Sequence, residues 1–301
     1  KIKGKRYLTF HPNTIVYAIP DGTASAAEVK RAKIGIVWHT TYTGNSFESM
    51  RASYGVDVNR LRKSANVWSQ DAMLRNALGA TMSAKDTIAI LGGTGDLGTG
   101  LAIRWSKAGY NIVIGSRTQE KADAAVAALA EISPDTPAQA MENTAAAAAG
   151  DIVVLTVPAD HQISTLDGVK DSLQGKILID VTVPLVPPKV GTVQMPPEGS
   201  AGKRAQDFLG EDVHVVSAFQ NIAAHLLQQD VVIECDVLVA GNSKESRQRV
   251  IDLISEAGMN GWHAGPIANA AAAEALTSIL IQINRSGIVS HSGIKIIGQE
   301  H

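Results

Sequence analysis

An apolar run, a glycine-rich turn and a helical stretch follow one another directly just beyond residue 85, and they constrain the fold more than any other feature of the sequence. The run Thr87–Leu91 is typical of a buried strand, and residues 99–108 are typical of a helix. Between them the pattern G-x-G-x-x-G falls on Gly93, Gly95 and Gly98. We expect the first glycine to permit a tight turn, the second to let a pyrophosphate approach the backbone, and the third to let the helix pack on the strand. The pattern predicts a dinucleotide site at a helix N-terminus, where free N–H groups bind phosphate.

The end of the next strand indicates which dinucleotide is bound. Residues 110–115 form a second strand-like run that ends in Ser116 and Arg117, and Lys121 follows one helical turn later. Sites that prefer NAD place an acidic residue at this strand end, where it binds the ribose 2′-hydroxyl. A hydroxyl and two cations are suited instead to a 2′-phosphate, which Arg117 can hold with a bidentate fork. The sequence favours NADP(H) over NAD(H), although the two cations could also be a solvated helix start.

The alternation of helical and strand-like runs continues to residue 217. Three runs have the continuous apolar character of strands buried on both faces. The order predicts an α/β fold, a Rossmann-type doubly wound parallel sheet, for an NADP-binding domain at residues 82–217. A small, mainly helical C-terminal domain is predicted at residues 218–301. The further elements are strands at 151–157, 176–181, 213–217 and 237–240 and helices at 121–132, 244–257 and 268–285.

Ligands of open parallel sheets bind beyond the carboxyl ends of the strands. We therefore expect one cleft to collect the residues that follow these strands, and the Pro- and Gly-rich connection 185–210 to be a mobile cover over it. The cleft candidates are Thr156, Pro158, His161, Pro184 and Ser217.

The last helical stretch, residues 268–285, is apolar almost all round. It must be buried, either in a homodimer or as a core helix of one chain. Between Ala268 and Leu280 there is no Lys or His, and Glu274 is the only ionisable residue. This stretch therefore offers few groups for general acid-base chemistry. Hydride transfer between two bound cofactors, with the protein supplying orientation, fits better.

The first 81 residues differ from the rest in charge. They contain 12 Lys and Arg but 5 Asp and Glu, whereas residues 82–301 contain 15 and 24. This asymmetry predicts two pieces of different origin. The first piece is an extra α+β segment of unknown function, with strands at 14–19 and 33–39 and a helix at 24–33. It matches no family pattern that we recognise, and it is consistent with a fusion or a fragment. Its basic, aromatic start (Lys1, Lys3, Lys5, Arg6, Tyr7, Phe10) is a weak indication of nucleic-acid binding, which we consider unlikely.

The remaining composition excludes several classes of protein. No run of about 18 apolar residues is present, and no secretory signal follows the basic start, so we predict a cytoplasmic protein with no membrane association. The single cysteine, Cys235, cannot form an internal disulfide, and no Cys/His cluster has metal-ligand spacing. We expect no metal ligands.

Taken together and in order, the motifs of residues 82–298 resemble the F420H2:NADP oxidoreductase family, also called NADPH-dependent F420 reductases. This resemblance implies direct hydride exchange between the nicotinamide of NADP(H) and C5 of the deazaflavin coenzyme F420, usually in a homodimer. The segments that carry it are 90–98, Ile114-Gly115-Ser116-Arg117 with Lys121, Thr156-Val157-Pro158, Ser217 to Asn221, Leu276-Thr277 and Gly293-Ile294-Lys295.

The resemblance also implies a division of the site. Thr94, Ser116, Arg117 and Lys121 would hold NADP, the last three at the 2′-phosphate, while Pro158, His161 and the stretch from Ala218 to Asn221 would face the deazaflavin. Gln220 and Asn221 depart from the archaeal pattern of His and Thr, and their amides can still donate hydrogen bonds to a deazaflavin carbonyl. No catalytic residue is expected. The expected cofactor-binding residues are Gly93, Thr94, Gly95, Asp96, Leu97, Gly98, Ser116, Arg117, Lys121, Thr156, Val157, Pro158, His161, Ala218, Gln220 and Asn221.

Two alternatives remain open at this point. The same scaffold could reduce a flavin, a metal chelate or a small carbonyl compound with NADPH. It could also be a non-catalytic module that holds NADP without turnover.

Overall fold

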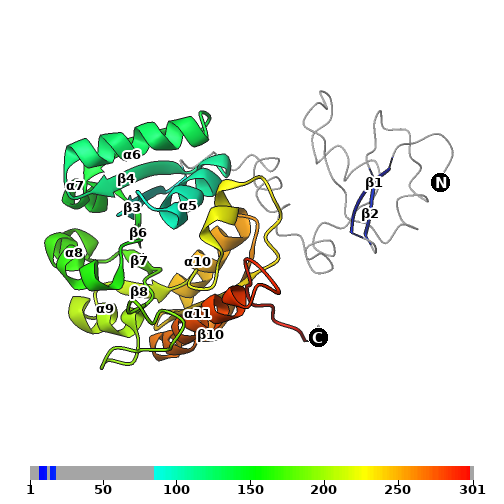
Figure 1. Ribbon diagram of the computed structural model, residues 1–301. Coiled ribbons are helices and arrows are strands. Elements are labelled where there is room, and N and C mark those ends of the chain that lie inside the picture. Colours follow the sequence, from blue (N-terminus) through cyan, green and yellow to red (C-terminus); the bar gives the residue numbers. More distant parts are fainter. Residues whose placement is uncertain (1–6, 12–13, 18–84, 299–301) are drawn as a thin grey trace. The chain divides into compact units, whose positions relative to one another are not determined.

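The computed structural model describes residues 7–11, 14–17 and 85–298. The chain divides into two compact units, Lys1–Ser83 and Ala84–His301. In the first unit, β1 (Tyr7–His11) pairs antiparallel with β2 (Thr14–Tyr17), which lies within the strand predicted at 14–19 (Figure 1). The helix predicted at 24–33, the strand predicted at 33–39 and basic residues 1–6 lie outside the described residues.

An eight-stranded sheet forms the centre of the second unit, in the order β10-β9-β8-β7-β6-β3-β4-β5 (Figure 1). Every neighbouring pair is parallel except β8 and β9. β3 and β6 lie side by side, and the chain adds later strands outward on each side, β4 and β5 beside β3 and β7 to β10 beside β6. The position between β3 and β6 is therefore the switch point of a doubly wound sheet. The strands are β3 (Thr87–Leu91), β4 (Asn111–Ser116), β5 (Ala138–Glu142), β6 (Ile152–Leu155), β7 (Ile177–Asp180), β8 (His214–Ser217), β9 (Asp236–Gly241) and β10 (Asn260–Gly265).

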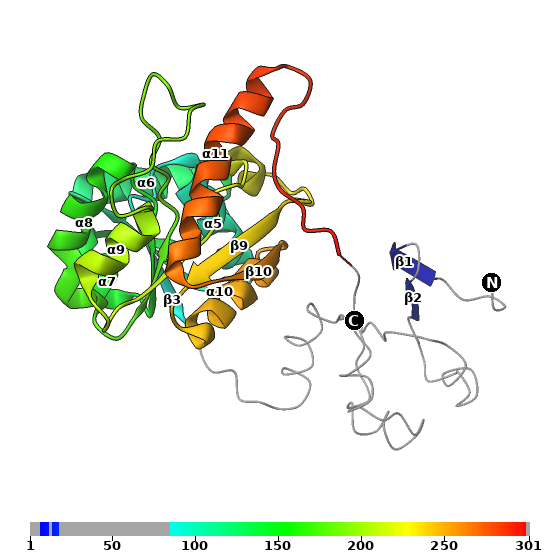
Figure 2. The ribbon, with the colours of Figure 1, turned by 90° about the horizontal axis from the view of Figure 1, so that it is seen from below.

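Helices cover both faces of this sheet. Side chains alternate along β3, so that Ile88 and Ile90 pack with α5, α6 and α10, while Ala89 and Leu91 pack with α7, α8 and α9. Helix α11 lies beside α9 (Figure 2). The predicted Rossmann-type fold is confirmed. The helices are α5 (Asp96–Lys107), α6 (Gln119–Ile132), α7 (Asn143–Ala149), α8 (Gln162–Val169), α9 (Ala201–Leu209), α10 (Lys244–Glu256) and α11 (Ala270–Arg285).

The structure corrects two expectations about the elements. The sheet is not wholly parallel, because β9 runs antiparallel to β8. The connection at 185–210, expected to be a mobile cover, contains α9, whose Ala201 and Ala205 are fully buried. Burial of this kind ties the second half of the connection to the core.

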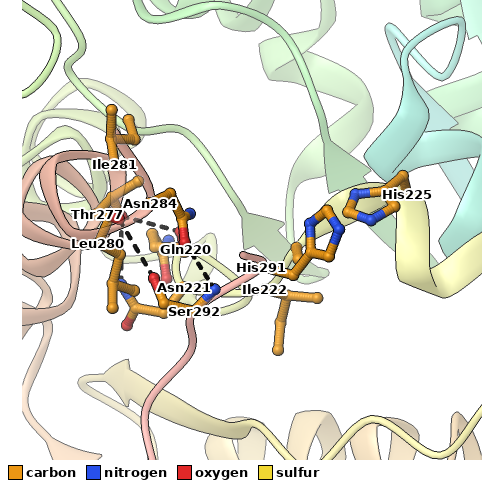
Figure 3. A pocket seen from close by; sticks show the side chains of 11 residues that line it. Gln220, Asn221, Ile222, His225, Thr277, Leu280, Ile281, Asn284, His291 and Ser292 are labelled. Carbon is orange, nitrogen blue, oxygen red and sulfur yellow. Dashed lines mark hydrogen bonds between the residues drawn. The ribbon is translucent and has the colours of Figure 1, made fainter. Parts of the chain in front are cut away.

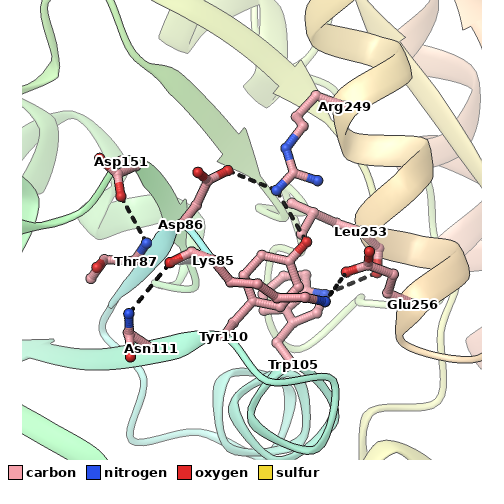
Figure 4. Close-up of polar contacts among 10 residues, drawn as sticks. All are labelled: Lys85, Asp86, Thr87, Trp105, Tyr110, Asn111, Asp151, Arg249, Leu253 and Glu256. Carbon is pink, nitrogen blue, oxygen red and sulfur yellow. Dashed lines mark hydrogen bonds and ion pairs between the residues drawn. The ribbon is translucent and has the colours of Figure 1, made fainter. Parts of the chain in front are cut away.

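The last part of the chain shares the same sheet, because β9 and β10 extend it past β8. Polar contacts add to this connection at the start of β3 (Figure 4). One Nη2 atom of Arg249 on α10 donates to Asp86 Oδ2 at 2.7 Å and to the hydroxyl of Tyr110 at 3.0 Å. The indole Nε1 of Trp105 donates to the carbonyl of Leu253 at 3.0 Å. The boundary predicted after Ser217 falls inside this continuous sheet, and the assignment of separate roles to its two sides stays a prediction.

A glycine allows a short segment to pack tightly on α5. A Cβ atom added at Gly100 would lie 2.4 Å from Cβ of Leu227, in the 3₁₀ segment η3 (Ala224–Gln228). One turn further along α5, the guanidinium of Arg104 donates to the carbonyl of Leu227 at 3.0 Å, and to those of Leu226, Gln229 and Val231. Close backbone approach and one half-buried guanidinium therefore hold η3 against the first helix of the nucleotide fold.

We expect Gly100→Ala to lower the free energy of unfolding by about 1–3 kcal/mol, because the added methyl group overlaps Leu227. The matched control is Gly168→Ala in α8, where an added Cβ meets no atom within 4 Å and a helical glycine is replaced by a better helix former. The control should raise the free energy of unfolding by about 0.5–1 kcal/mol. Urea unfolding followed by circular dichroism measures both, and equal effects would contradict the packing argument.

Candidate functional site

The turn after β3 lies against the segment after β6 at the switch point of the sheet. Gly92 adopts the left-handed conformation, with φ of +72°, and a Cβ added there would lie 2.5 Å from Cγ1 of Val157. Its N–H donates to the carbonyl of Gly115 at 3.0 Å. Of the two glycines Gly92 and Gly93, only Gly92 has a positive φ. The conformation of the tight turn therefore requires glycine at Gly92, and not at Gly93 as the motif predicted.

Gly93 and Gly98 instead bring the helix onto the turn. A Cβ at Gly98 would lie 2.7 Å from Cα of Gly93 and 3.1 Å from the hydroxyl oxygen of Thr156. That hydroxyl donates to the carbonyl of Leu91 at 2.9 Å, which ties β6 to the end of β3. The predicted role of Gly98 in close helix packing is confirmed, and half-buried Leu97 packs beside it against the core.

Gly95 differs from its neighbours, because a Cβ added there would meet no atom within 4 Å. It is the N-cap of α5, and no side chain caps this helix end. Thr94, Gly95 and Asp96 are all exposed. Uncapped N–H groups at a helix N-terminus bind anions, so this open position fits the pyrophosphate of a dinucleotide.

The end of β4 presents the predicted cations to solvent. Ser116 is buried as the last residue of the strand, and Arg117 and Lys121 are exposed on either side of the N-cap Thr118 of α6. Within the described part of the chain, neither cationic side chain has a hydrogen bond or ion pair. Both are therefore available to bind an anion at this strand end.

The predicted residues after β6 approach the same edge of the sheet. Pro158 is exposed and precedes a 3₁₀ turn, η1 (Ala159–His161), that leads directly into α8. The imidazole of His161 is exposed and makes no hydrogen bond to any described residue. These two residues lie on the chain at the carboxyl end of β6, beside the switch point.

The predicted residues after β8 are buried, and their amides are used inside the protein. Ala218 is fully buried, and Phe219 has a φ of +74° that turns the chain sharply. Gln220 Nε2 donates to the carbonyl of Asp180 and to Ser217 Oγ, both at 2.9 Å. Asn221 Nδ2 donates to the carbonyl of Ala273 at 2.8 Å and to the hydroxyl of Thr277 at 3.2 Å.

In this structure the amide hydrogens of Gln220 and Asn221 are used within the chain, and a role of these amides toward a ligand carbonyl stays a prediction. Each amide nitrogen carries two hydrogens, and both already have acceptors within the chain. The buried Oε1 of Gln220, by contrast, has no donor. In this loop the amide oxygen of Gln220, and not its nitrogen, lacks a partner.

A cavity of about 220 Å³ opens next to this loop (Figure 3). Its walls come from the loop after β8, the second half of α11 and the segment that follows α11. The rings of His225 and His291 meet at one end, with centroids 3.9 Å apart. All of the described lining side chains are apolar, amide, hydroxyl or imidazole groups, so no Lys, Arg, Asp or Glu of the described residues lines the cavity. The lining residues that are not among the expected cofactor-binding residues are Ile222, Ala223, His225, Thr277, Leu280, Ile281, Asn284, His291 and Ser292.

Buried charged groups that the sequence did not indicate lie beneath the carboxyl edge. Asp180, the last residue of β7, accepts from the backbone N–H of Thr182 at 2.8 Å and from Nε2 of Gln162. Burial raises the pKa of this carboxyl, while the bonds from Thr182 and Gln162 lower it. The one signal for Asp180 in the sequence is that it is a polar residue at the end of the apolar run Ile177–Ile179.

Glu274 on α11 caps the N-terminus of α9 from a neighbouring helix. Its carboxylate accepts from the N–H of Ala201 at 2.7 Å and of Gly202 at 2.9 Å. Burial raises the pKa of Glu274 to about 7, against these two hydrogen bonds, and the nearby carboxyl of Asp180 raises it further. The only ionisable residue between Ala268 and Leu280 is thus used to join two helices.

Two features are absent from the described residues. Among the described residues, no group of three or more His, Cys, Asp or Glu side chains is placed to hold a metal ion. In the same residues, no helix is both long and apolar enough to cross a bilayer.

The fold and the site define an oxidoreductase scaffold of the dinucleotide-binding class. The family model described as "NADP oxidoreductase coenzyme F420-dependent" matches residues 87–184. The chain is 39% identical over 222 residues to the F420-dependent NADP reductase of Methanocaldococcus jannaschii, covering 71% of this chain and 99% of the relative. It is also 39% identical over 217 residues to the F420-dependent NADP reductase of Methanothermobacter thermautotrophicus, covering 69% and 94%. The chain belongs to the family of F420-dependent NADP reductases.

Solved structures agree with the fold. A structure described as a putative F420-dependent NADP reductase from Arthrobacter sp. FB24 superposes with a TM-score of 0.60 at 24% identity, covering 70% of this chain and 99% of that one. The expectation that residues 1–81 match no family is wrong, because residues 1–92 match a family of unknown function, DUF6267.

Glu274 gives a pH-dependent stability that can be measured. Because its folded pKa of about 7 exceeds its ordinary value of 4.5, the folded state binds more protons between these pH values, and stability falls as the pH rises through them. The loss amounts to about 3 kcal/mol by pH 8. Glu274→Gln lacks this titration. In urea unfolding from pH 4 to pH 8, the wild-type chain should lose stability relative to the variant, and a constant difference would contradict the assignment.

Proposed function

We propose that this protein transfers a hydride between NADP(H) and the deazaflavin coenzyme F420. The observation that carries the proposal is the uncapped N-terminus of α5 at the switch point, with two unpaired cations at the end of β4. Such a site fits a dinucleotide that carries a third phosphate on its ribose. Identities of 37–39% to three F420-dependent NADP reductases support F420 as the second reactant.

For NADP, the turn and helix start supply backbone N–H groups to the pyrophosphate. The residues for this contact are Gly93, Thr94, Gly95, Asp96, Leu97 and Gly98. Ser116, Arg117 and Lys121 hold the 2′-phosphate: Arg117 as a planar fork and Lys121 as a point charge. Thr156 and Val157 line the approach from β6, where they contact the glycine turn.

For F420, the deazaflavin faces Pro158 and His161 on one side and the loop from Ala218 to Asn221 on the other. The neutral cavity beside this loop suits an uncharged, flat ring system with polar edges. Among the described residues, no group donates a hydrogen bond to the buried Oε1 of Gln220. Gln220 and Asn221 therefore shape the loop through their amide nitrogens.

No side chain of this site is assigned as a general acid or base. Bound NADPH supplies the hydride, and the protein holds the two reactants in register and excludes water. The segments after β7 and β8 are joined by the hydrogen bond from Gln220 Nε2 to the carbonyl of Asp180, which fixes them relative to one another. Orientation is then the main contribution of the chain.

A homodimer is part of the proposal. Ile279 and Ile283, one turn apart on α11, are 46% and 41% exposed, so the described residues leave a strip of this helix uncovered. The same strip on a second copy would bury it. The predicted cytoplasmic location and the role of residues 1–81 stay predictions.

Arg117→Ala should weaken NADPH binding at least tenfold and leave NADH binding within about twofold, because only NADPH has the 2′-phosphate for the lost fork. The matched control is Lys244→Ala, which removes an exposed cation from the first turn of α10. Fluorescence titration of the reduced nucleotides measures both. An equal loss for the two nucleotides would show that Arg117 does not read the 2′-phosphate.

The activity itself is tested by mixing the full chain with NADPH and oxidised F420 and following the visible absorbance of the deazaflavin. A parallel reaction contains a flavin in place of F420. Rapid bleaching with F420 and not with the flavin is expected. Bleaching of the flavin alone, or of neither in a protein that binds NADPH, would contradict F420 as the acceptor.

A further inference from the structure

One carboxylate joins the two segments that the proposed function places against the deazaflavin. The side chain of Asp180 is 1% exposed. Its Oδ2 atom accepts from Gln162, the first residue of α8 directly after the Pro158–His161 segment. Its own backbone carbonyl accepts from the N–H of Ala218 at 3.2 Å and from Nε2 of Gln220 at 2.9 Å. Asp180 thus bonds to the chain on both sides of the proposed acceptor site.

The amide of Gln162 has only one orientation that satisfies its partners. Arg204 on α9 donates from Nε to Gln162 Oε1 at 2.8 Å, and a guanidinium can only donate. Nε2 of Gln162 therefore faces its two acceptors, Asp180 Oδ2 and the carbonyl of Ala201 at 3.0 Å. Arg204 also donates from Nη2 to the carbonyl of Ala159 at 3.0 Å, inside the segment itself. The Pro158–His161 segment is therefore held from α9 and from β7 together.

We propose that Asp180 is a positioning residue for the acceptor, acting through the chain Asp180–Gln162–Arg204. It sets the distance between the Pro158–His161 segment and the loop after β8, and it does so without touching either reactant. The inference rests on the proposed function, since that function places the deazaflavin between these two segments. Burial raises the pKa of Asp180, while the hydrogen bonds from Thr182 and Gln162 and the charge of Arg204 oppose that rise.

The alternative is that Asp180 serves stability alone, as buried, bonded carboxylates often do. A purely structural role would change the folded fraction but not the properties of the molecules that fold. A positioning role would change F420 binding and turnover in folded protein. The two are separable because NADP is expected to be held elsewhere, at α5 and the end of β4.

The test is Asp180→Asn, which conserves size and keeps Oδ1 for Thr182. Its Nδ2 would face Nε2 of Gln162, placing two donors together, and Gln162 cannot turn its amide over while Arg204 holds Oε1. We expect the Kd for F420, from its fluorescence in the presence of NADP+, to rise about tenfold. We expect kcat to fall by at least tenfold, because small displacements are costly in hydride transfer, and the Kd for NADPH to stay within about threefold.

The matched control is Thr136→Val, an isosteric loss of a buried hydroxyl that bonds to Ser133 far along the chain from these segments. It should leave all three constants within twofold. If folded Asp180→Asn protein has the same Kd for F420 and the same kcat as the wild type, the inference is overturned and the proposed function is not. Absence of F420 binding in the unmodified chain would overturn the proposed function, and the inference with it.

A double variant tests whether the two residues act through one chain. Arg204 holds the Pro158–His161 segment through Gln162 and the carbonyl of Ala159, and Asp180 holds it through the same amide of Gln162. Asp180→Asn combined with Arg204→Met should therefore raise the Kd for F420 by less than the product of the two single effects. Losses that simply multiply would overturn the proposed chain. Should Asp180→Asn not fold, the single variant Arg204→Met, at a half-buried position, is expected to raise the Kd for F420 at least threefold, and an unchanged Kd would overturn the inference.

Discussion

The contact between α5 and the glycine turn is the constraint on which the rest of the site depends. Cα of Gly93 occupies the space where a side chain at position 98 would lie, so the helix begins directly above the end of β3. This places uncapped N–H groups at the switch point, where the segment after β6 also arrives. The same helix then presents Gly100 and Arg104 to η3, which carries His225 to the cavity. One closely packed helix thus organises both the nucleotide end and one wall of the neighbouring cavity.

Hydride transfer between two bound molecules makes orientation the main requirement, and the buried polar groups suit that requirement. Asp180, Gln162 and Arg204 connect three segments at the carboxyl edge, while Glu274 joins α11 to α9. Each buried charge has hydrogen-bond partners, as its desolvation demands. The pKa of Glu274 nevertheless rises to about 7 because burial outweighs its two backbone hydrogen bonds. The same buried groups therefore contribute both to the stability of the fold and to the position of the segments around the site.

Local patterns predicted the elements that are rich in apolar residues, and they missed those that are not. β3, β4, β6 and β7 are continuous apolar runs and were readily predicted. β10 (Asn260–Gly265) contains two glycines, a histidine and one exposed Trp, and β5 (Ala138–Glu142) is a partly exposed edge strand, so neither has a strand-like pattern. β10 pairs with β9 and β5 with β4, and these pairings, which hold both strands in the sheet, cannot be read from the sequence.

The sequence by itself determined the class of fold, the glycine turn and the cations at the end of β4, because each depends on residues close together in the chain. It could not determine that Gly92 takes the positive φ or that Val157 packs against it, since the segment after β6 reaches this turn only in the folded sheet. Nor could it show that the amides of Gln220 and Asn221 are already satisfied, because their acceptors lie up to 56 residues away. Only the tertiary structure brings Asp180, Gln162 and Arg204 together, since hydrogen bonds between distant segments exist only once the sheet and its helices have packed.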